Sequence, residues 1–407
     1  MIKQYSPLVT PLSALIILTM GSALLTTFLS LKLESIGVSN IWIGGMTTAY
    51  YAGIVLGAFK LEKLILRVGH IRSYSAFASM LAVISILHGF YIDVYFWLIL
   101  RFLGGIVTAG LYVVIESWIL GNTTNNNRGK FLALYMIALY VAQALGQALL
   151  NISLSNIVLM YCISGILASI SVIPLTLTKI SAPTISEPET LGIKKIFSLS
   201  PSGVMTCFVS GMVLGGIYGL YPVYIKHIGY STADISLIMG VTILGGMLFQ
   251  FPLGKLSDII SRRLLIGLLS LCSVLVSIFI IMFGGYNIVI LLLLSLIFGG
   301  ATFCLYPIGI SHACDRIVGN QIVSATQTLL LSYGIGAMLG PLIASIMSLF
   351  FKGYGLLVFI ITVCLPLSIF VFIRKHIVPP VAYEDKLDFI AVTELTPVTN
   401  EMDPRNE

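Results

Sequence analysis

The apolar stretch 95–119 contains polar or small residues at intervals of three or four positions. They are Arg101, Gly105, Thr108, Tyr112 and Glu116. Residues at that spacing share one face of an α-helix, and we expect this face to line a central cavity. The arginine could bind a carboxylate group. The glutamate could bind a proton or attract a cation, because a carboxylate removed from water can exchange protons near neutral pH.

Each of the two charged residues has a second interpretation. Arg101 lies only a turn or two inside its stretch, so its long side chain could reach the lipid headgroups. Glu116 follows Arg101 by 15 positions, about 22 Å along a helix, and therefore lies towards the opposite end. There it could act as a latch by pairing with a basic residue near a neighbouring loop, namely Arg67, Arg72 or Arg128.

Further polar side chains within apolar stretches could also bind a small molecule. They are Tyr140, Gln143, Gln147, Tyr218, Tyr221 and Tyr306. Alternatively, such side chains join helices through hydrogen bonds. The five histidines and six cysteines are scattered, and no phosphate-binding loop with Lys and Ser/Thr occurs, so no metal-binding or catalytic set is indicated. We therefore expect neither an enzyme nor a cofactor.

The composition determines the class of protein. Of 407 residues, 58% are hydrophobic and only 9% are charged, compared with about 25% charged in soluble domains. Such a chain cannot cover a water-soluble globule with polar surface, so we expect it to lie in a lipid bilayer. Apolar stretches long enough to span a bilayer occur at about 8–31, 41–60, 73–92, 95–119, 130–151, 156–178, 202–225, 235–255, 264–284, 288–311, 321–349 and 355–373. Twelve transmembrane helices are therefore predicted.

The distribution of basic residues predicts the orientation of these helices. With the N-terminus inside, 18 of the 22 Lys and Arg residues lie in cytoplasmic segments, as expected from the positive-inside rule. The other four are Lys32, Arg101, Lys226 and Lys352. Both termini are thus expected in the cytoplasm. The net charge of +6 reflects this topology and does not indicate a nucleic-acid partner.

The two parts of the chain resemble each other at a nearly constant offset. The matching pairs are Ile36–Ser39 with Ile228–Ser231 (offset 192), Gly104-Gly105 with Gly299-Gly300 (offset 195) and Leu145-Gly146 with Leu339-Gly340 (offset 194). Such a pattern is expected of two duplicated six-helix units. We predict a six-helix bundle over 1–178, a cytoplasmic linker over 179–200 and a second bundle over 201–375. The polar remainder, 376–407, is predicted to be a disordered cytoplasmic tail.

A short charged loop between two of the stretches carries a family resemblance. Its sequence from Gly254 to Arg263 is GKLSDIISRR, and this pattern resembles the loop signature of the major facilitator superfamily of transporters. The spacing Arg101-x-x-x-Gly105 resembles a second signature, found in proton-coupled members. Residues 95–150 resemble the YcaD-like branch of that superfamily. The resemblance implies an all-α integral membrane protein, with twelve transmembrane helices in two pseudo-symmetric six-helix bundles.

The resemblance also implies a set of residues that control conformational change. The expected set is Gly57, Arg67, Gly69, Arg72, Arg128, Gly254, Asp258, Arg262, Arg263, Gly336, Gly340 and Pro341. We expect Asp258 to lie at the N-terminus of the helix beginning near Arg128, where the helix dipole favours a carboxylate. That contact would lock the outward-facing state. The glycines and proline at 336–341 resemble an antiporter motif, although close helix packing would also explain them. His312 and Asp315 are expected at a solvated helix end or in a second latch.

Together these features predict a monomeric secondary transporter of a bacterial inner membrane that moves a small organic molecule by alternating access. Arg101 favours a substrate that bears a carboxylate, and a proton gradient is the expected driving force. The expected partners are the substrate, protons and the lipid bilayer. One alternative is a proton-coupled efflux pump for cationic or amphipathic drugs, using Glu116. Another, of a different class, is a non-transporting receptor or sensor built on a transporter scaffold.

Overall fold

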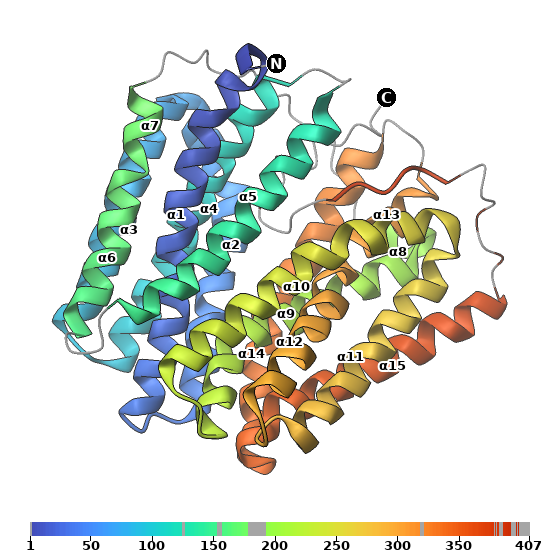
Figure 1. The fold of residues 1–407 in the computed structure, drawn as a ribbon. Helices are drawn as coiled ribbons and strands as arrows, with labels where there is room; N and C mark the ends of the chain where they lie inside the picture. Colours follow the sequence, from blue (N-terminus) through green and yellow to red (C-terminus); the bar gives the residue numbers. More distant parts are fainter. Residues whose placement is uncertain are drawn as a thin grey trace.

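The computed structural model is an all-helical protein (Figure 1). It describes residues 2–123, 127–152, 157–177, 193–317, 321–377, 379, 381, 386–391, 396 and 398. Within these residues, twelve helical stretches of 19 to 29 residues are long and apolar enough to cross a membrane. The predicted all-α fold and the predicted number of transmembrane helices are therefore confirmed. Most of the predicted linker lies outside the described residues.

The helices form two groups that follow each other along the chain. The N half contains α1 (Ile2–Ser35), α2 (Asn40–Val68), α3 (His70–Phe90), α4 (Val94–Gly121), α5 (Arg128–Ala148), α6 (Ile157–Ile170) and α7 (Val172–Thr176). The C half contains α8 (Ile193–Leu199), α9 (Pro201–His227), α10 (Thr232–Ile259), α11 (Arg262–Phe283), α12 (Ile288–Phe303), α13 (Leu305–Cys314), α14 (Ile322–Phe350) and α15 (Gly355–Ile377). Helices α6 and α7 share one span, and so do α12 and α13.

The sequence repeat corresponds to a repeated helix ending. After α1, the amide of Gly37 donates to Glu34 and the next amide donates to Leu33. After α9, the amide of Gly229 donates to Lys226 and the next amide donates to Ile225 in the same pattern. Both glycines have a left-handed φ, 78° and 97°, as this type of helix C-cap requires. The same residues therefore end equivalent helices in the two halves.

Glycines allow helices within each half to pack closely. In the C half, a Cβ atom added at Gly336 or Gly340 of α14 would overlap a backbone carbonyl of α9. In the N half, Gly53 of α2 and Gly105 of α4 face each other's helix in the same way. These contacts favour the packing interpretation of the motif around Gly336, because backbones can approach only where side chains are missing.

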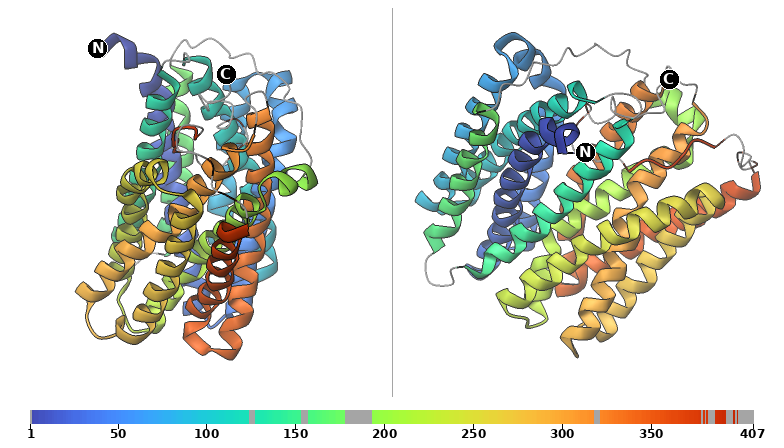
Figure 2. Two further views of the ribbon diagram at one scale, coloured as in Figure 1. Left: turned by 90° about the vertical axis from the view of Figure 1, so that its right-hand side faces the viewer. Right: turned by 45° about the horizontal axis from the view of Figure 1, so that its top comes forward.

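The two halves touch at one end of the molecule. We call the end that holds the start of α1, the α10–α11 connection and the described tail residues the tail end, and the opposite end the far end. Near the far end, the Thr48 hydroxyl of α2 donates to the carbonyl of Met338 on α14 at 2.8 Å. The Ser236 hydroxyl of α10 donates to the carbonyl of Gln147 at 2.6 Å. Towards the tail end the helices of the two halves diverge (Figures 1 and 2).

The described part of the tail lies against the helices at the tail end. Lys386 bonds to backbone carbonyls at the end of α10, and the buried hydroxyl of Thr396 contacts Glu116 on α4. For these residues the structure differs from the disordered tail predicted above. The reason is that the tail's polar groups find hydrogen-bond partners on the helices, which its own composition does not reveal.

Candidate functional site

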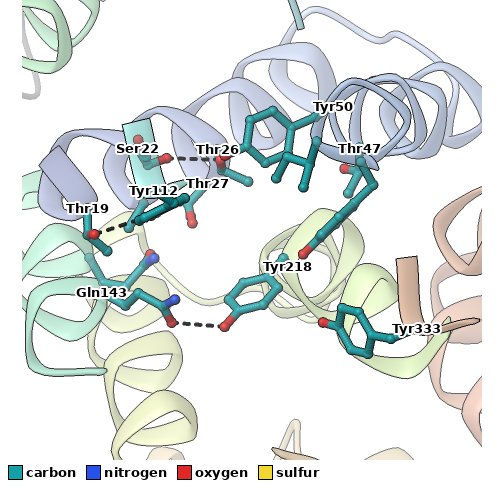
Figure 3. Close-up of a pocket in the computed structure, with 14 residues that line it drawn as sticks. Thr19, Ser22, Thr26, Thr27, Thr47, Tyr50, Tyr112, Gln143, Tyr218 and Tyr333 are labelled. Atoms are coloured by element: carbon teal, nitrogen blue, oxygen red, sulfur yellow. Dashed lines mark hydrogen bonds between the residues drawn. The ribbon is translucent and has the colours of Figure 1, made fainter. Parts of the chain in front are cut away.

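A polar cavity lies between the two halves (Figure 3). Its volume is about 80 Å³, room for several water molecules or a small solute. Six helices supply its lining, which consists of Thr19, Ser22, Ala23, Thr26, Thr27, Thr47, Tyr50, Tyr51, Ile54, Tyr112, Gln143, Gln147, Tyr218 and Tyr333. All but Ala23 and Ile54 carry a hydroxyl or amide group, although their rings and methyl groups also face the cavity, and none of the described lining residues is charged. The cavity is therefore suited to a small polar molecule held mainly by hydrogen bonds.

Four of the predicted binding residues lie in this cavity, namely Tyr112, Gln143, Gln147 and Tyr218. The Tyr112 hydroxyl shares a hydrogen bond of 3.2 Å with Thr19 on α1. The Tyr218 hydroxyl of α9 donates to the Gln143 side-chain oxygen of α5 at 2.9 Å. This second bond joins the C half to the N half across the cavity. A ligand that competes for either group would therefore disturb a contact between helices.

None of the cavity residues on α1 and α2 is among the predicted binding residues. Thr19, Ser22 and Thr26 all line the cavity, and their spacing of three and four places them on one helix face. That periodicity was available in the sequence. Thr47, Tyr50 and Tyr51 of α2 show similar spacing. Tyr333 carries no comparable signal, because a single tyrosine in an apolar helix gives no indication of the direction it faces.

Three other predicted binding residues pack beside or behind the cavity. The Tyr140 ring of α5 packs against the end of α12. The Tyr221 hydroxyl shares a 2.7 Å hydrogen bond with Ser295 inside the C half. The Tyr306 ring lies 4.8 Å from the ring of Tyr333, so it supports a lining residue. None of the three is among the described residues that line the cavity.

Arg101 is buried, with 5% of its surface exposed, so it does not extend to the headgroups. Its Cζ atom lies 4.0 Å from the centre of the Tyr50 ring, and Nη2 lies 3.4 Å from the Thr26 hydroxyl. It lines a second, smaller cavity together with His88 and Thr108. No carboxylate of a described residue lies within ion-pair distance of Arg101. Tyr50 borders both cavities and stands between the guanidinium and the central one.

Glu116 is buried towards the tail end and does not line the central cavity. One of its oxygens accepts a 2.6 Å hydrogen bond from the Tyr135 hydroxyl of α5. The other accepts from the Thr396 hydroxyl of the tail. The polar face predicted over 95–119 therefore does not face one cavity, and that prediction is wrong. The reason is that α2 covers its middle, where a Cβ atom at Gly105 would overlap the carbonyl oxygen of Tyr50.

The predicted gating residues of the N half make few polar contacts. Arg67 and Arg72 are exposed and Arg128 is partly buried. None of the three forms a hydrogen bond or an ion pair with another residue in the described chain. Gly69, with a φ of 97°, forms the turn between α2 and α3, and Gly57 packs against α4. The predicted pairing of Glu116 with one of these arginines is thus not seen.

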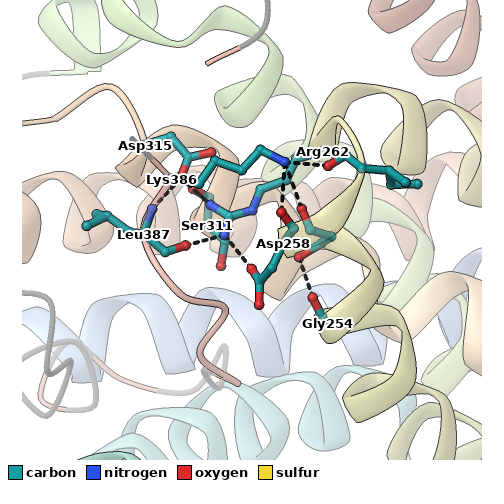
Figure 4. A network of polar contacts seen from close by, with 9 residues as sticks. Gly254, Asp258, Arg262, Ser311, Asp315, Lys386 and Leu387 are labelled. Carbon is teal, nitrogen blue, oxygen red and sulfur yellow. Dashed lines mark hydrogen bonds and ion pairs between the residues drawn. The ribbon is translucent and has the colours of Figure 1, made fainter. Parts of the chain in front are cut away.

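Arg262 is the centre of a polar network at the tail end of the C half (Figure 4). It donates to Asp258 at 2.8 Å, to the Ser311 carbonyl at 2.8 Å and to the Asp315 carboxylate. The Arg262 and Asp315 side chains are only 1% and 2% exposed, while that of Asp258 is 30% exposed. His312 is also buried, beside Arg263. The solvated helix end predicted for His312 and Asp315 is therefore wrong, because α11 packs over α13 and Arg262 neutralises Asp315.

Asp258 takes a different partner from the one predicted. Its carboxylate accepts a hydrogen bond from Arg262, four positions later in the chain. Its expected contact with the start of α5 is not among the interactions of the described residues. Gly254, one helical turn earlier on the same face of α10, lies directly beneath the ring of Phe389 from the tail.

Sequence comparison places the chain in a family. Residues 12–330, and in a second match 203–393, fit the profile of the Major Facilitator Superfamily. The chain is 32% identical over 341 residues to "Uncharacterized MFS-type transporter YcaD" of Escherichia coli O6:K15:H31, a match that covers 82% of this chain and 87% of the relative. The protein of the same name from Salmonella enteritidis PT4 is 31% identical over 347 residues, covering 84% and 88%.

Solved structures agree on the fold. The bacterial homologue of the human lysosomal transporter Spinster, in an inward-facing and occupied conformation, has a TM-score of 0.75 at 14% identity, covering 93% of this chain and 97% of that one. The D-xylose-proton symporter has a TM-score of 0.72 at 16% identity, covering 93% and 98%. At these identities the similarity concerns the fold alone. With the sequence match, the twelve spans and the cavity between two halves, the chain belongs to the major facilitator superfamily and is an integral membrane transporter.

Proposed function

We propose that this transporter carries a small organic molecule bearing a carboxylate, with the central cavity as its binding site. Its membrane is the bacterial inner membrane, with both termini in the cytoplasm, so the tail end faces the cytoplasm. The basic residues of the connections support this orientation. The single observation that carries the substrate class is Arg101, a buried cation with no carboxylate partner among the described residues.

The energetics of Arg101 favour an anionic ligand. Removing a guanidinium group from water costs several kcal/mol, about as much as a close carboxylate can restore. Among the described residues, only the Tyr50 ring and a long contact to Thr26 offset this cost. A substrate carboxylate could form two parallel, charge-assisted hydrogen bonds with the guanidinium. The Tyr50 ring stands between the two cavities, so we expect it to turn aside when such a substrate binds.

The cavity lacks the carboxylate that a cationic substrate would pair with. Its five tyrosine rings could face a cation, but they carry no negative charge. None of the described lining residues is acidic, and Glu116 is held by Tyr135 and Thr396. We assign Glu116 to proton coupling instead, since it is a fully buried carboxylate on the same helix as Arg101.

Ligand-induced stabilisation of the purified protein tests this proposal. The wild type, Arg101→Ala, Glu116→Gln and the control Lys63→Ala are each tested with organic anions (acetate, benzoate, succinate) and with lipophilic cations (tetraphenylphosphonium, ethidium). At a concentration 100 times its Kd, a ligand that binds only the folded state adds about 2.7 kcal/mol to the free energy of unfolding. We expect a carboxylate to stabilise the wild type and Lys63→Ala, which loses an exposed charge, but not Arg101→Ala. Stabilisation by cations that is lost in Glu116→Gln would contradict the proposal.

Transport measurements then test whether uptake is coupled to protons. An imposed proton gradient should accelerate uptake of the stabilising carboxylate into proteoliposomes. Addition of a protonophore should return the uptake rate to its value without a gradient. In Glu116→Gln we expect uptake to persist without responding to the gradient. Binding without any flux would indicate a receptor.

A further inference from the structure

The tail segment Lys386–Ala391 is anchored on the end of α10. The Lys386 ammonium group donates to the carbonyls of Ser257, Asp258 and Ile260 at 3.4, 3.1 and 2.6 Å. Carbonyls at a helix C-terminus lack partners within the helix and carry a partial negative charge, so a cation is favourable there. Partial burial and the nearby Arg262 charge lower the pKa of Lys386 below its ordinary value of 10.5. The lysine therefore acts as a C-cap for α10.

The backbone and apolar side chains of the same segment bind the Arg262 network. The Leu387 amide donates to Asp315 at 3.3 Å, and its carbonyl accepts from Arg262 (Figure 4). Phe389 covers Gly254, and Ile390 is 9% exposed within the hydrophobic core. Arg262 and Asp315, the buried ion pair of the C-half network, therefore both bind this one segment of the tail.

Further along, the tail reaches the N half. Thr396 is fully buried and its hydroxyl donates to Glu116 on α4. Val398 is 3% exposed and belongs to the same hydrophobic core. Figure 1 shows the red tail segment running along the tail end of the C half, in the direction of the N half. The tail thus contacts both halves at the end where their helices diverge.

We propose that the C-terminal tail is a wedge that keeps the two halves apart at the tail end and so restrains the transport cycle. Alternating access requires the halves to rock until the tail end closes. For that closure the face of α10 bearing Gly254 and Asp258 must approach the N half, and Phe389 covers this face. Release of the tail would uncover Gly254, leave the α10 terminus without its lysine cap and free Glu116 from Thr396.

Distance measurements without any ligand test this proposal. Spin labels are placed on Lys63→Cys of α2 and Lys255→Cys of α10, both exposed at the tail end, after the six native cysteines are replaced by alanine. Double electron–electron resonance compares the full chain with a chain ending at Ile377. Because no substrate is used, the result does not depend on the proposed function, whose own test uses ligand binding.

We expect the full chain to show a long distance and the truncated chain to shift most of its population to shorter distances. Phe389→Glu should shift the distribution in the same direction, while Asp388→Asn, which alters an exposed neighbour, should leave it unchanged. If the truncated chain is poorly folded, the full-length variants Phe389→Glu and Lys386→Met replace it in the comparison, and both should shift the distances in the same direction. An unchanged or longer distance in folded variants that lack the tail contacts overturns the proposal.

Discussion

Replacing Arg262 by methionine should destabilise the protein far more than removing the Asp258 carboxylate, which belongs to the signature loop Gly254–Arg263. The substitution leaves the Asp315 carboxylate, whose side chain is 2% exposed, without its cation. It also removes the donor to the Ser311 carbonyl. Breaking a buried ion pair by removing one member costs about 3–5 kcal/mol, because the remaining charge is uncompensated. We expect a loss of stability in this range.

Asp258 provides the matched comparison. It binds the same guanidinium at 2.8 Å, but its side chain is 30% exposed and it lies four positions from Arg262. Such pairs contribute about 0.3–0.5 kcal/mol, since water screens the charges. Asp258→Asn should therefore lower the free energy of unfolding by less than 1 kcal/mol, roughly the value of an exposed pair. We therefore expect the loss of stability in Arg262→Met to be several times that in Asp258→Asn.

The assay is equilibrium unfolding in mixed micelles titrated with SDS, followed by circular dichroism. The double variant Arg262→Met/Asp315→Leu serves as the rescue, because replacing both members of a buried pair by apolar groups is often neutral. It should recover more than half of the loss of Arg262→Met, a clear departure from additivity. An equal loss of stability in Asp258→Asn and Arg262→Met would refute the different weights given to the two ion pairs. A double variant Arg262→Met/Asp315→Leu less stable than Arg262→Met would refute the cost assigned to the unpaired Asp315 carboxylate.

Two further predictions concern helix packing and the Glu116 environment. Gly336→Ala places a methyl group against the Phe208 carbonyl of α9 and should lower stability in the same assay by about 1–3 kcal/mol, whereas Gly285→Ala, with nothing within 4 Å, should be neutral. Tyr135→Phe removes the 2.6 Å hydrogen bond to Glu116 and should cost about 1.5–3 kcal/mol. The exposed Tyr286→Phe is its control, and equal effects of the two tyrosine substitutions would contradict the assigned role of Tyr135.

The architecture was predictable because its signals are local. Bilayer-length apolar stretches fix the number of helices without reference to any contact, and the Ile-Gly-x-Ser repeat fixes two equivalent helix ends. The GKLSDIISRR loop identified the Arg262 region, although not its partners. Asp315 lies 53 positions from Arg262 and carries no signal that joins the two.

The direction in which each polar side chain points was less predictable, because it depends on how helices are rotated against each other. The face of α4 that begins at Arg101 has a clear helical period, yet α2 covers its centre at Gly105. The row from Thr19 to Thr26 on α1 has the same period and does line the cavity. Periodicity defines a face, and only the packing of neighbouring helices decides whether that face is open.

The sequence repeat shows that the two halves differ in where they carry buried charged residues. At the offset of 195 that relates Gly105 to Gly300, Arg101 corresponds to Leu296 and Glu116 to Ser311. The N half therefore holds two buried charges where the C half has an apolar residue and a serine, and the Ser311 carbonyl instead binds Arg262. On the proposed function, only one half needs to carry charge for substrate and proton, since a second set in the membrane would add a desolvation cost without adding a site. The other half is free to hold the Arg262 network, which receives the tail. We infer that the charged groups for substrate and proton belong to the N half and that most of the tail's anchors belong to the C half, so Arg101 and Arg262 substitutions should affect binding and conformational change differently.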